Sequence, residues 1–119
     1  MRKIKDLLEQ NERVWIYLKS DQETRDFMRN AKAEGFRWLN GDEITDEDRG
    51  HIIGIRKDLR IGHVSMYIWG MAFQCDRSGA QTPMRVDYGL YRAGEENFVC
   101  QRPGISGFLS LSAEKDKSR

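Results

Sequence analysis

Two histidines are the side chains of this chain best suited to acid–base or metal chemistry. His51 and His63 lie in two apolar segments that could pair as strands, and such pairing would bring the imidazoles near one another. Asp46 and Asp48 supply carboxylates nearby, but there is no H-x-x-x-H, H-x-H or Cys/His cluster of the kind a zinc site requires. A small metal-dependent or hydrolytic enzyme using His51 and His63 is therefore only a second alternative, and we expect no metal or other cofactor.

Nucleophilic catalysis and phosphate binding lack their usual sequence signatures. Cys75 and Cys100 follow no C-x-x-C pattern, and neither G-x-S-x-G nor a glycine-rich phosphate loop occurs. Two cysteines in or beside strand-like, partly aromatic segments are most simply a reduced, buried pair. We therefore expect no catalytic residues and a protein that is not an enzyme.

The segment EGFRWLNGDEITDED, residues 34 to 48, concentrates aromatic and acidic side chains. Its carboxylates lack the spacing of an EF-hand, which argues against calcium binding. They form a local negative patch in a chain whose total charge is close to zero, and such a patch can meet a basic surface on another protein. The predicted protein-binding residues are Trp38, Asp42, Glu43, Asp46, Glu47 and Asp48.

A second group mixes cations with aromatic rings. Three cations crowd one predicted turn, and two aromatic residues follow on the next apolar segment. Aromatic rings can stack on bases while cations bind phosphates. The alternative function is therefore a nucleotide or nucleic-acid binding module that uses Arg56, Lys57, Arg60, Tyr67 and Trp69.

Composition limits the classes of partner. The 119 residues include 20 Lys and Arg against 19 Asp and Glu, a formal charge of +1 that removes a strong overall attraction for phosphate backbones. No apolar run approaches the roughly 20 residues that span a bilayer. The first residues, MRKIKDLLEQ, lack the apolar segment of a secretory signal. We expect a cytoplasmic protein that makes no membrane contact.

The elements that must position these residues begin with a short helix. Apolar residues repeat at helical spacing over residues 3–11, and so short a helix must dock on the core or on a second copy of the chain. A homodimer is thus left open. RVWIYLKS then alternates two apolar faces and predicts a strand. The face with Trp15 and Tyr17 needs a cover, which we assign to another part of the same chain.

A helix is predicted over residues 21–34. Ser20 and Glu23 have the spacing of a capping box, and Gly35 stands where a left-handed residue ends a helix. Its apolar stripe consists of Thr24, Phe27, Met28 and Ala31. This helix should cover the strand face opposite the aromatic one.

Three turns divide the rest of the chain. Asn40-Gly41 favours a type I′ turn between a strand and its short return. A second hairpin is predicted around Lys57-Asp58, with its later strand extending over about residues 60–69, and a third around residues 93–96.

Together these elements predict a single α+β domain over residues 1–111. We expect a mostly antiparallel sheet with one main helix packed on a face and a short N-terminal helix. Residues 112–119 contain no large apolar side chain and are predicted to form a flexible charged tail.

The order of strand, capped helix and hairpin over residues 13–65 resembles small proteins encoded by phages, prophages and other mobile elements. The resemblance is carried by the GF-x-W-x-x-G turn and the I-x-I-x-x-D pattern that follows it. It implies a protein that works in a bacterial host, where it binds and inhibits a host or defence protein or sequesters a nucleotide. The leading hypothesis is therefore a non-enzymatic binding protein that inhibits or modulates a host protein.

Overall fold

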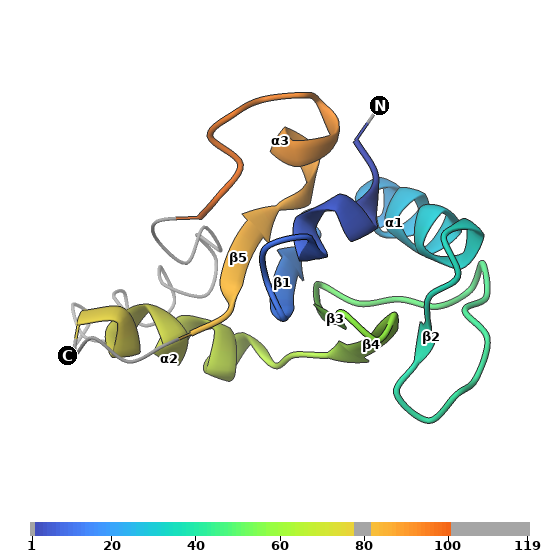
Figure 1. Cartoon of the computed structure of the whole chain (residues 1–119), viewed down its shortest axis with the longest axis horizontal. Coiled ribbons are helices and arrows are strands. Elements are labelled where there is room, and N and C mark those ends of the chain that lie inside the picture. The colour runs from blue at the N-terminus through green and yellow to red at the C-terminus, as the bar shows by residue number, and fades with distance from the viewer. Residues whose placement is uncertain (1, 78–81, 101–119) are drawn as a thin grey trace, which may run out of the picture.

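The computed structural model describes residues 2–77 and 82–100, which form an α+β protein around a five-stranded sheet (Figure 1). The strand order is β2-β4-β3-β1-β5. The elements are the 3₁₀ helix η1 (Ile4–Leu8), β1 (Arg13–Tyr17), α1 (Asp21–Ala33), β2 (Arg37–Trp38), β3 (Ile52–Arg56), β4 (Arg60–His63), α2 (Met66–Arg77), β5 (Met84–Asp87) and α3 (Tyr88–Arg92). The predicted fold class is confirmed.

The sheet is mixed, which corrects the prediction of a mostly antiparallel one. β3 pairs antiparallel with β4, as the second predicted hairpin requires, and antiparallel with β1. However, β1 runs parallel to β5, and β2 runs parallel to β4. Parallel neighbours cannot be joined by a tight turn and need a long crossover. Turn residues therefore predict the β3–β4 hairpin but carry no information on the parallel pairs.

The main helix, α1, forms where the capping residues predict it. Ser20 Oγ accepts a hydrogen bond from the Glu23 amide (3.2 Å), and the Glu23 carboxylate accepts one from the Lys19 amide (3.0 Å), one residue before the expected cap amide. Gly35 follows with φ +94°, the left-handed conformation that ends many helices. The whole predicted stripe is buried: Thr24, Phe27, Met28 and Ala31.

The N-terminal helix docks on the core of its own chain. η1 is shorter and tighter than the helix predicted over residues 3–11, and all three of its apolar side chains are buried. The Glu34 carboxylate, just after α1, accepts hydrogen bonds from the amides of Ile4 (2.9 Å) and Lys5 (2.8 Å). Amides at the start of a helix have no partner within it, so Glu34 satisfies two of them and ties η1 to α1.

The strand predicted over residues 60–69 is wrong beyond residue 63. Ser65 Oγ accepts a hydrogen bond from the Ile68 amide (3.1 Å), and α2 begins at Met66. Met66, Trp69 and Phe73 then recur at helical spacing and pack with one another against the sheet. The β-branched and aromatic composition of the segment favours a strand, but this periodic burial stabilises a helix.

The third predicted hairpin is also wrong in its first arm. β5 ends at Asp87, whose carboxylate accepts a hydrogen bond from the Leu90 amide (3.1 Å) and so caps α3. The return segment does reach the sheet, because Val99 forms an antiparallel bridge with Val86. An aspartate after a short apolar strand is therefore a helix cap here, although the alternation of apolar residues continues past it.

The turn at Asn40-Gly41 has a different geometry from the predicted type I′. Of these two residues only Gly41 has a positive φ, +93°. The Gly41 amide donates to the Trp38 carbonyl (2.8 Å), and the Trp38 amide donates to the Asp42 carbonyl (2.9 Å). This is a three-residue loop with its glycine in the left-handed region. The return is a single antiparallel bridge between Arg37 and Glu43 rather than a strand.

Within residues 2–77 and 82–100, no helix is both long and apolar enough to cross a membrane. The predicted boundary between the domain and a tail at residue 112 lies outside the described residues.

We expect Ile4→Ala to lower the free energy of unfolding by about 3 kcal/mol, because Ile4 is fully buried and the change leaves a cavity between η1 and the core. Urea unfolding measures the loss. Lys5→Ala, at an exposed position of the same helix, is the matched control and should cost less than about 1 kcal/mol. Equal losses in the two variants would show that η1 is not part of the core.

Candidate functional site

The two faces of the sheet are covered to different extents (Figure 1). Side chains alternate between the faces along each strand. One face belongs to the main core that includes α1, and contributes Val14, Ile16, Ile53, Ile55 and Ile61. On the opposite face, α2 covers one end, where Trp69 packs on Tyr17 with 5.8 Å between ring centroids. The other end of that face we call the open face.

Four arginines form a row across the open face, one on each of four neighbouring strands. Arg13 of β1 is the register partner of Arg56 of β3, and Arg60 of β4 is the partner of Arg37 of β2. The β3–β4 register, in which Ile55 faces Ile61, places Arg56 opposite Arg60. We call Arg13, Arg56, Arg60 and Arg37 the arginine row. Register partners on neighbouring strands project to the same side of a sheet.

Only part of the positive charge in the arginine row is neutralised. Arg56 pairs with Asp58, and this guanidinium holds the pKa of the Asp58 carboxyl below its usual value. Arg37 pairs with Glu43 at 3.5 Å, while Arg60 donates to the Trp38 carbonyl at 3.3 Å. Within the described residues, two carboxylates therefore form ion pairs with a row of four guanidinium groups.

A small hollow lies beside the arginine row, two residues further along the strands. Its floor consists of Gly54 and Gly62, which are register partners on β3 and β4. A Cβ at Gly54 would lie 3.3 Å from Trp15 Cδ1, and one at Gly62 only 2.6 Å from Leu39 Cδ1, so these two side chains form opposite walls. The hollow has a volume of about 150 Å³. We call it the glycine hollow.

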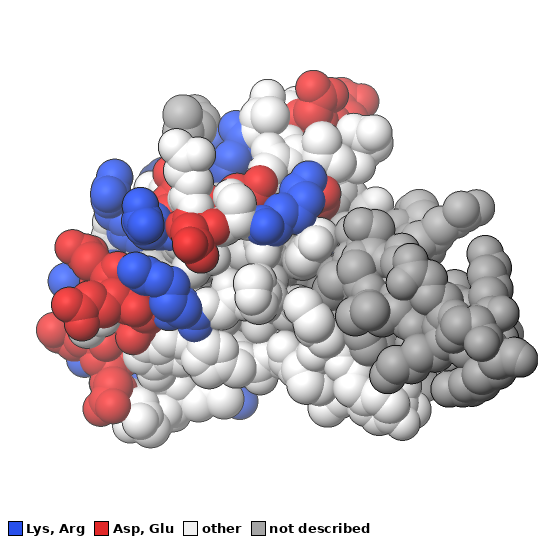
Figure 2. Space-filling view, turned by 180° about the vertical axis from the view of Figure 1, so that it is seen from behind, with Lys and Arg blue, Asp and Glu red and all other residues white. Residues whose placement is uncertain are grey.

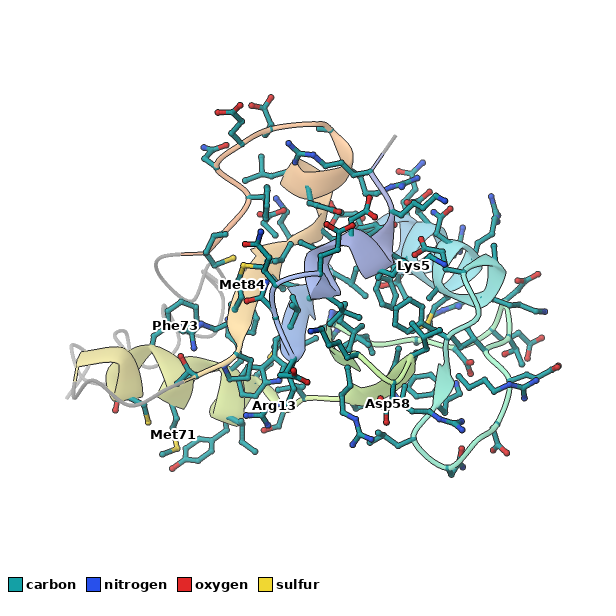
Figure 3. All side chains as sticks on the ribbon, viewed as in Figure 1. Lys5, Arg13, Asp58, Met71, Phe73 and Met84 are labelled. Atoms are coloured by element: carbon teal, nitrogen blue, oxygen red, sulfur yellow. The ribbon has the colours of Figure 1, made fainter. Side chains whose placement is uncertain are left out.

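Large apolar side chains are exposed on the same side of the molecule. Leu39, a wall of the glycine hollow, is 57% exposed. The outer surface of α2 exposes Tyr67 (66%), Ile68 (51%) and Met71 (42%). Figure 3 shows Met71, Arg13 and Asp58 along one side of the molecule. The open face and the outer surface of α2 thus present apolar groups and arginines together.

Not all of the residues predicted from sequence to bind a nucleotide lie on the protein surface. Trp69 is fully buried, so its ring is not available to a base, which removes it from that set. Tyr67 is exposed on α2, and Lys57 forms an ion pair with Glu12 (3.7 Å). Arg56 and Arg60 remain, as members of the arginine row.

The predicted acidic surface divides into an internal and an external part. The Asp48 carboxylate accepts hydrogen bonds from Trp38 Nε1 and from the Thr45 amide, both at 2.8 Å. Burial tends to raise the pKa of Asp48, but these bonds hold it below its usual value. Trp38 also stacks on His63, with 4.8 Å between ring centroids. The side chains of Trp38 and Asp48 therefore contact other parts of the same chain and stabilise the 39–50 connection.

Four of the predicted acidic residues are exposed: Asp42, Glu43, Asp46 and Glu47. Figure 2 shows Asp and Glu side chains gathered at the end of the molecule where α1 and the 39–50 connection lie, with Lys and Arg beside them. A broad uncharged region occupies the middle of that view. The acidic group remains a candidate contact surface next to the Arg37 end of the arginine row.

Groups for acid–base, metal or thiol chemistry do not come together in the described residues. No set of three or more His, Cys, Asp or Glu side chains in residues 2–75 and 82–100 is placed to hold a metal ion. His63 is occupied by its stack on Trp38, and His51 is exposed. Both cysteines are reduced and partly buried, and Cys75 lies in α2 rather than in a strand.

Sequence reasoning missed Arg13, Trp15, Arg37, Leu39 and the two hollow glycines as site residues. The signal was present as residue pairs two apart, Arg13 with Trp15, Gly54 with Arg56, and Arg60 with Gly62. This pattern can be recognised as a site only when the register of the four strands is known, because the arginine row crosses the strands instead of following one of them.

Comparisons with known proteins add no assignment to this geometry. No protein-family model matches the chain, and no curated protein or solved structure matches it.

We expect Asp48→Asn to lower stability at neutral pH by about 1 kcal/mol, because an amide oxygen accepts the Trp38 and Thr45 hydrogen bonds more weakly than a carboxylate. The folded-state pKa of Asp48 is depressed, so its contribution is complete above the unfolded pKa and is lost as the pH falls through the folded one. The difference from wild type should therefore shrink below about pH 4.

Urea unfolding over a range of pH values measures that difference. Asp46→Asn, at an exposed carboxylate of the same connection, is the control and should change stability little at any pH. A deficit in Asp48→Asn that stays constant down to low pH would contradict the assignment.

Cys100 should be unreactive at pH 8. Burial raises the pKa of its thiol to about 11, so only roughly one molecule in a thousand carries the nucleophilic thiolate at that pH. Alkylation by iodoacetamide, followed by mass spectrometry of the Cys100 peptide, should be far slower in the folded chain than in urea. Similar rates in both states would contradict this.

Proposed function

We propose that this chain is a non-enzymatic binding protein that recognises a partner protein through the open face of its sheet. The observation that carries the proposal is the arginine row lying directly beside the glycine hollow. Arginine and tryptophan are enriched among the residues that dominate protein interfaces, and Trp15 and Arg13 stand together at one end of this surface.

The size of the glycine hollow favours a protein over a small ligand. Sites for small molecules and cofactors usually enclose about 300–1,000 Å³. The hollow has about half of the lower value, 150 Å³, and is open to solvent. A space of this size suits one ring or one branched side chain. In a protein interface, such a pocket receives a single anchor residue while the surrounding contacts exclude water.

Exposed apolar groups support the same proposal. Contiguous exposed apolar patches often mark interaction sites on proteins. Here Leu39 borders the hollow, while Tyr67, Ile68 and Met71 line the outer surface of the helix that covers the other end of the same sheet face. A partner that contacts the hollow and extends toward α2 would bury all four.

The acidic residues Asp42, Glu43, Asp46 and Glu47 stay a predicted contact surface, now as a flank of the open face. The resemblance to phage and prophage proteins, and with it inhibition of a host or defence protein in a bacterial cytoplasm, also stays a prediction. A homodimer would be one form of the proposed interaction.

The proposal is tested by capture of a partner from a lysate of the source organism on immobilised protein. We expect at least one protein to be retained by wild type and lost with the double variant Arg13→Glu/Arg56→Glu, because both changes place carboxylates in the arginine row. The matched control is Arg25→Glu/Arg29→Glu, which makes the same charge change at exposed positions of α1.

Circular dichroism confirms that all three chains fold before capture. Retention of a protein by wild type and by the α1 control, but not by the arginine-row variant, supports the proposal. A set of captured proteins that is identical for the three chains, or that is lost equally from both variants, counts against recognition through the open face.

A further inference from the structure

The arginine row and the glycine hollow together specify the chemistry of the partner. Resting on the proposed function, we infer that the partner presents an acidic segment with one apolar side chain. Its carboxylates bind the arginine row, and its apolar side chain enters the glycine hollow.

Uncompensated positive charge on the arginine row favours an anionic partner. Like charges directly opposite one another on neighbouring strands destabilise a sheet, because strands lie only about 4.8 Å apart. The row places four guanidinium groups in that arrangement, and among the residues that the structure describes only Asp58 and Glu43 form ion pairs with members of it. Arg13 is exposed, and none of its hydrogen bonds or ion pairs involves another described side chain. An anionic partner would relieve this repulsion.

All four positions of the row hold arginine rather than lysine, which favours carboxylates as the anions. A guanidinium presents a planar fork of N–H donors that matches a carboxylate in a bidentate geometry, whereas a lysine ammonium is a point charge. Arg56 already binds Asp58 through two of its nitrogens. Glutamate or aspartate side chains of a partner can bind Arg13 and Arg60 in the same way.

The spacing between the arginine row and the floor of the glycine hollow suits a single short segment of a partner. The glycine hollow lies two residues along the strands from the arginine row, roughly 7 Å away. Side chains separated by three or four positions on a helix have Cβ atoms about 5–6 Å apart, and alternate residues of an extended segment are about 7 Å apart. One short segment can therefore supply both the apolar group and its flanking carboxylates.

The lining of the hollow favours an apolar side chain over a nucleobase. Trp15, Leu39 and Val64 border it together with Arg13, Arg56 and His63, and the backbone of Gly54 and Gly62 is engaged in the pairing of β3 with β4. The two guanidinium groups are donors only, so the N–H groups of a base would lose their hydrogen bonds to water there with few replacements. The acidic group of Asp42 and Glu43 next to Arg37, and a total charge of +1, also work against a polyanion.

The test uses three synthetic peptides and one oligonucleotide, with the whole chain in a calorimeter. The first peptide carries glutamates around one central phenylalanine. The second replaces that phenylalanine by alanine, and the third replaces the glutamates by glutamine. Oligothymidine is the nucleic-acid probe. We expect the first peptide to bind and each replacement to weaken binding roughly tenfold or more, the loss typical of an interface anchor.

Variants of the chain locate the binding. Arg13→Glu/Arg56→Glu should abolish binding of the first peptide, while Arg25→Glu/Arg29→Glu should leave it unchanged. Gly62→Val adds methyl groups to the floor of the hollow and displaces Leu39, whose Cδ1 would lie 2.6 Å from the new Cβ. Circular dichroism checks that this variant folds, and its affinity for the first peptide should fall to that of the alanine peptide. If the capture experiment succeeds while the peptides fail to bind, the inference falls and the proposed function stands.

Three other results would overturn the inference. Oligothymidine that binds as tightly as the first peptide would indicate a nucleic-acid surface. A glutamine peptide that binds equally well would remove the role of the arginine row. Equal binding by the Gly62→Val variant and by wild type would remove the role of the hollow.

Discussion

Apolar packing of one sheet face into the core with α1 is the constraint on which the rest of this structure depends. Val14 and Ile16 on β1, with Ile53 and Ile55 on β3, are fully buried. Because side chains alternate along a strand, burying these residues assigns Arg13, Trp15, Gly54 and Arg56 to the other face without further choice. The candidate site is thus fixed by the same register that builds the core.

Tertiary packing, rather than local preference, decides how much of that second face is left open. The segment after β4 has the composition of a strand, and as a strand it would leave Tyr17 and Ile52 exposed. As α2 it places Trp69 on Tyr17, and Ile52 and Trp69 are both buried in one cluster. The helix is short relative to the sheet face, so the arginine row and the glycine hollow remain uncovered.

The parts of the fold that could be predicted are those encoded by neighbouring residues. Ser20 and Glu23 cap α1, Gly35 ends it, and the β3–β4 hairpin follows from alternation around Lys57-Asp58. The parallel pairs and the helical state of residues 66–77 depend on contacts between distant segments, which a single sequence does not display. The site falls in the second category. The arginine row combines residues from four strands that are not contiguous in the sequence: Arg37, Arg60, Arg56 and Arg13. The predicted acidic surface, in contrast, is one contiguous segment of the chain.

Each of the two edge strands of the sheet, β2 and β5, already pairs with a further segment of the chain on its outer side. At β2 the Arg37–Glu43 bridge occupies the outer edge, and at β5 the Cys100 amide donates to the Arg85 carbonyl while Val99 bridges Val86. Exposed strand edges are the usual template for self-association into fibrils. Because both edge strands already have a bridged neighbour, fewer of their backbone groups are left for edge-to-edge pairing with a second chain.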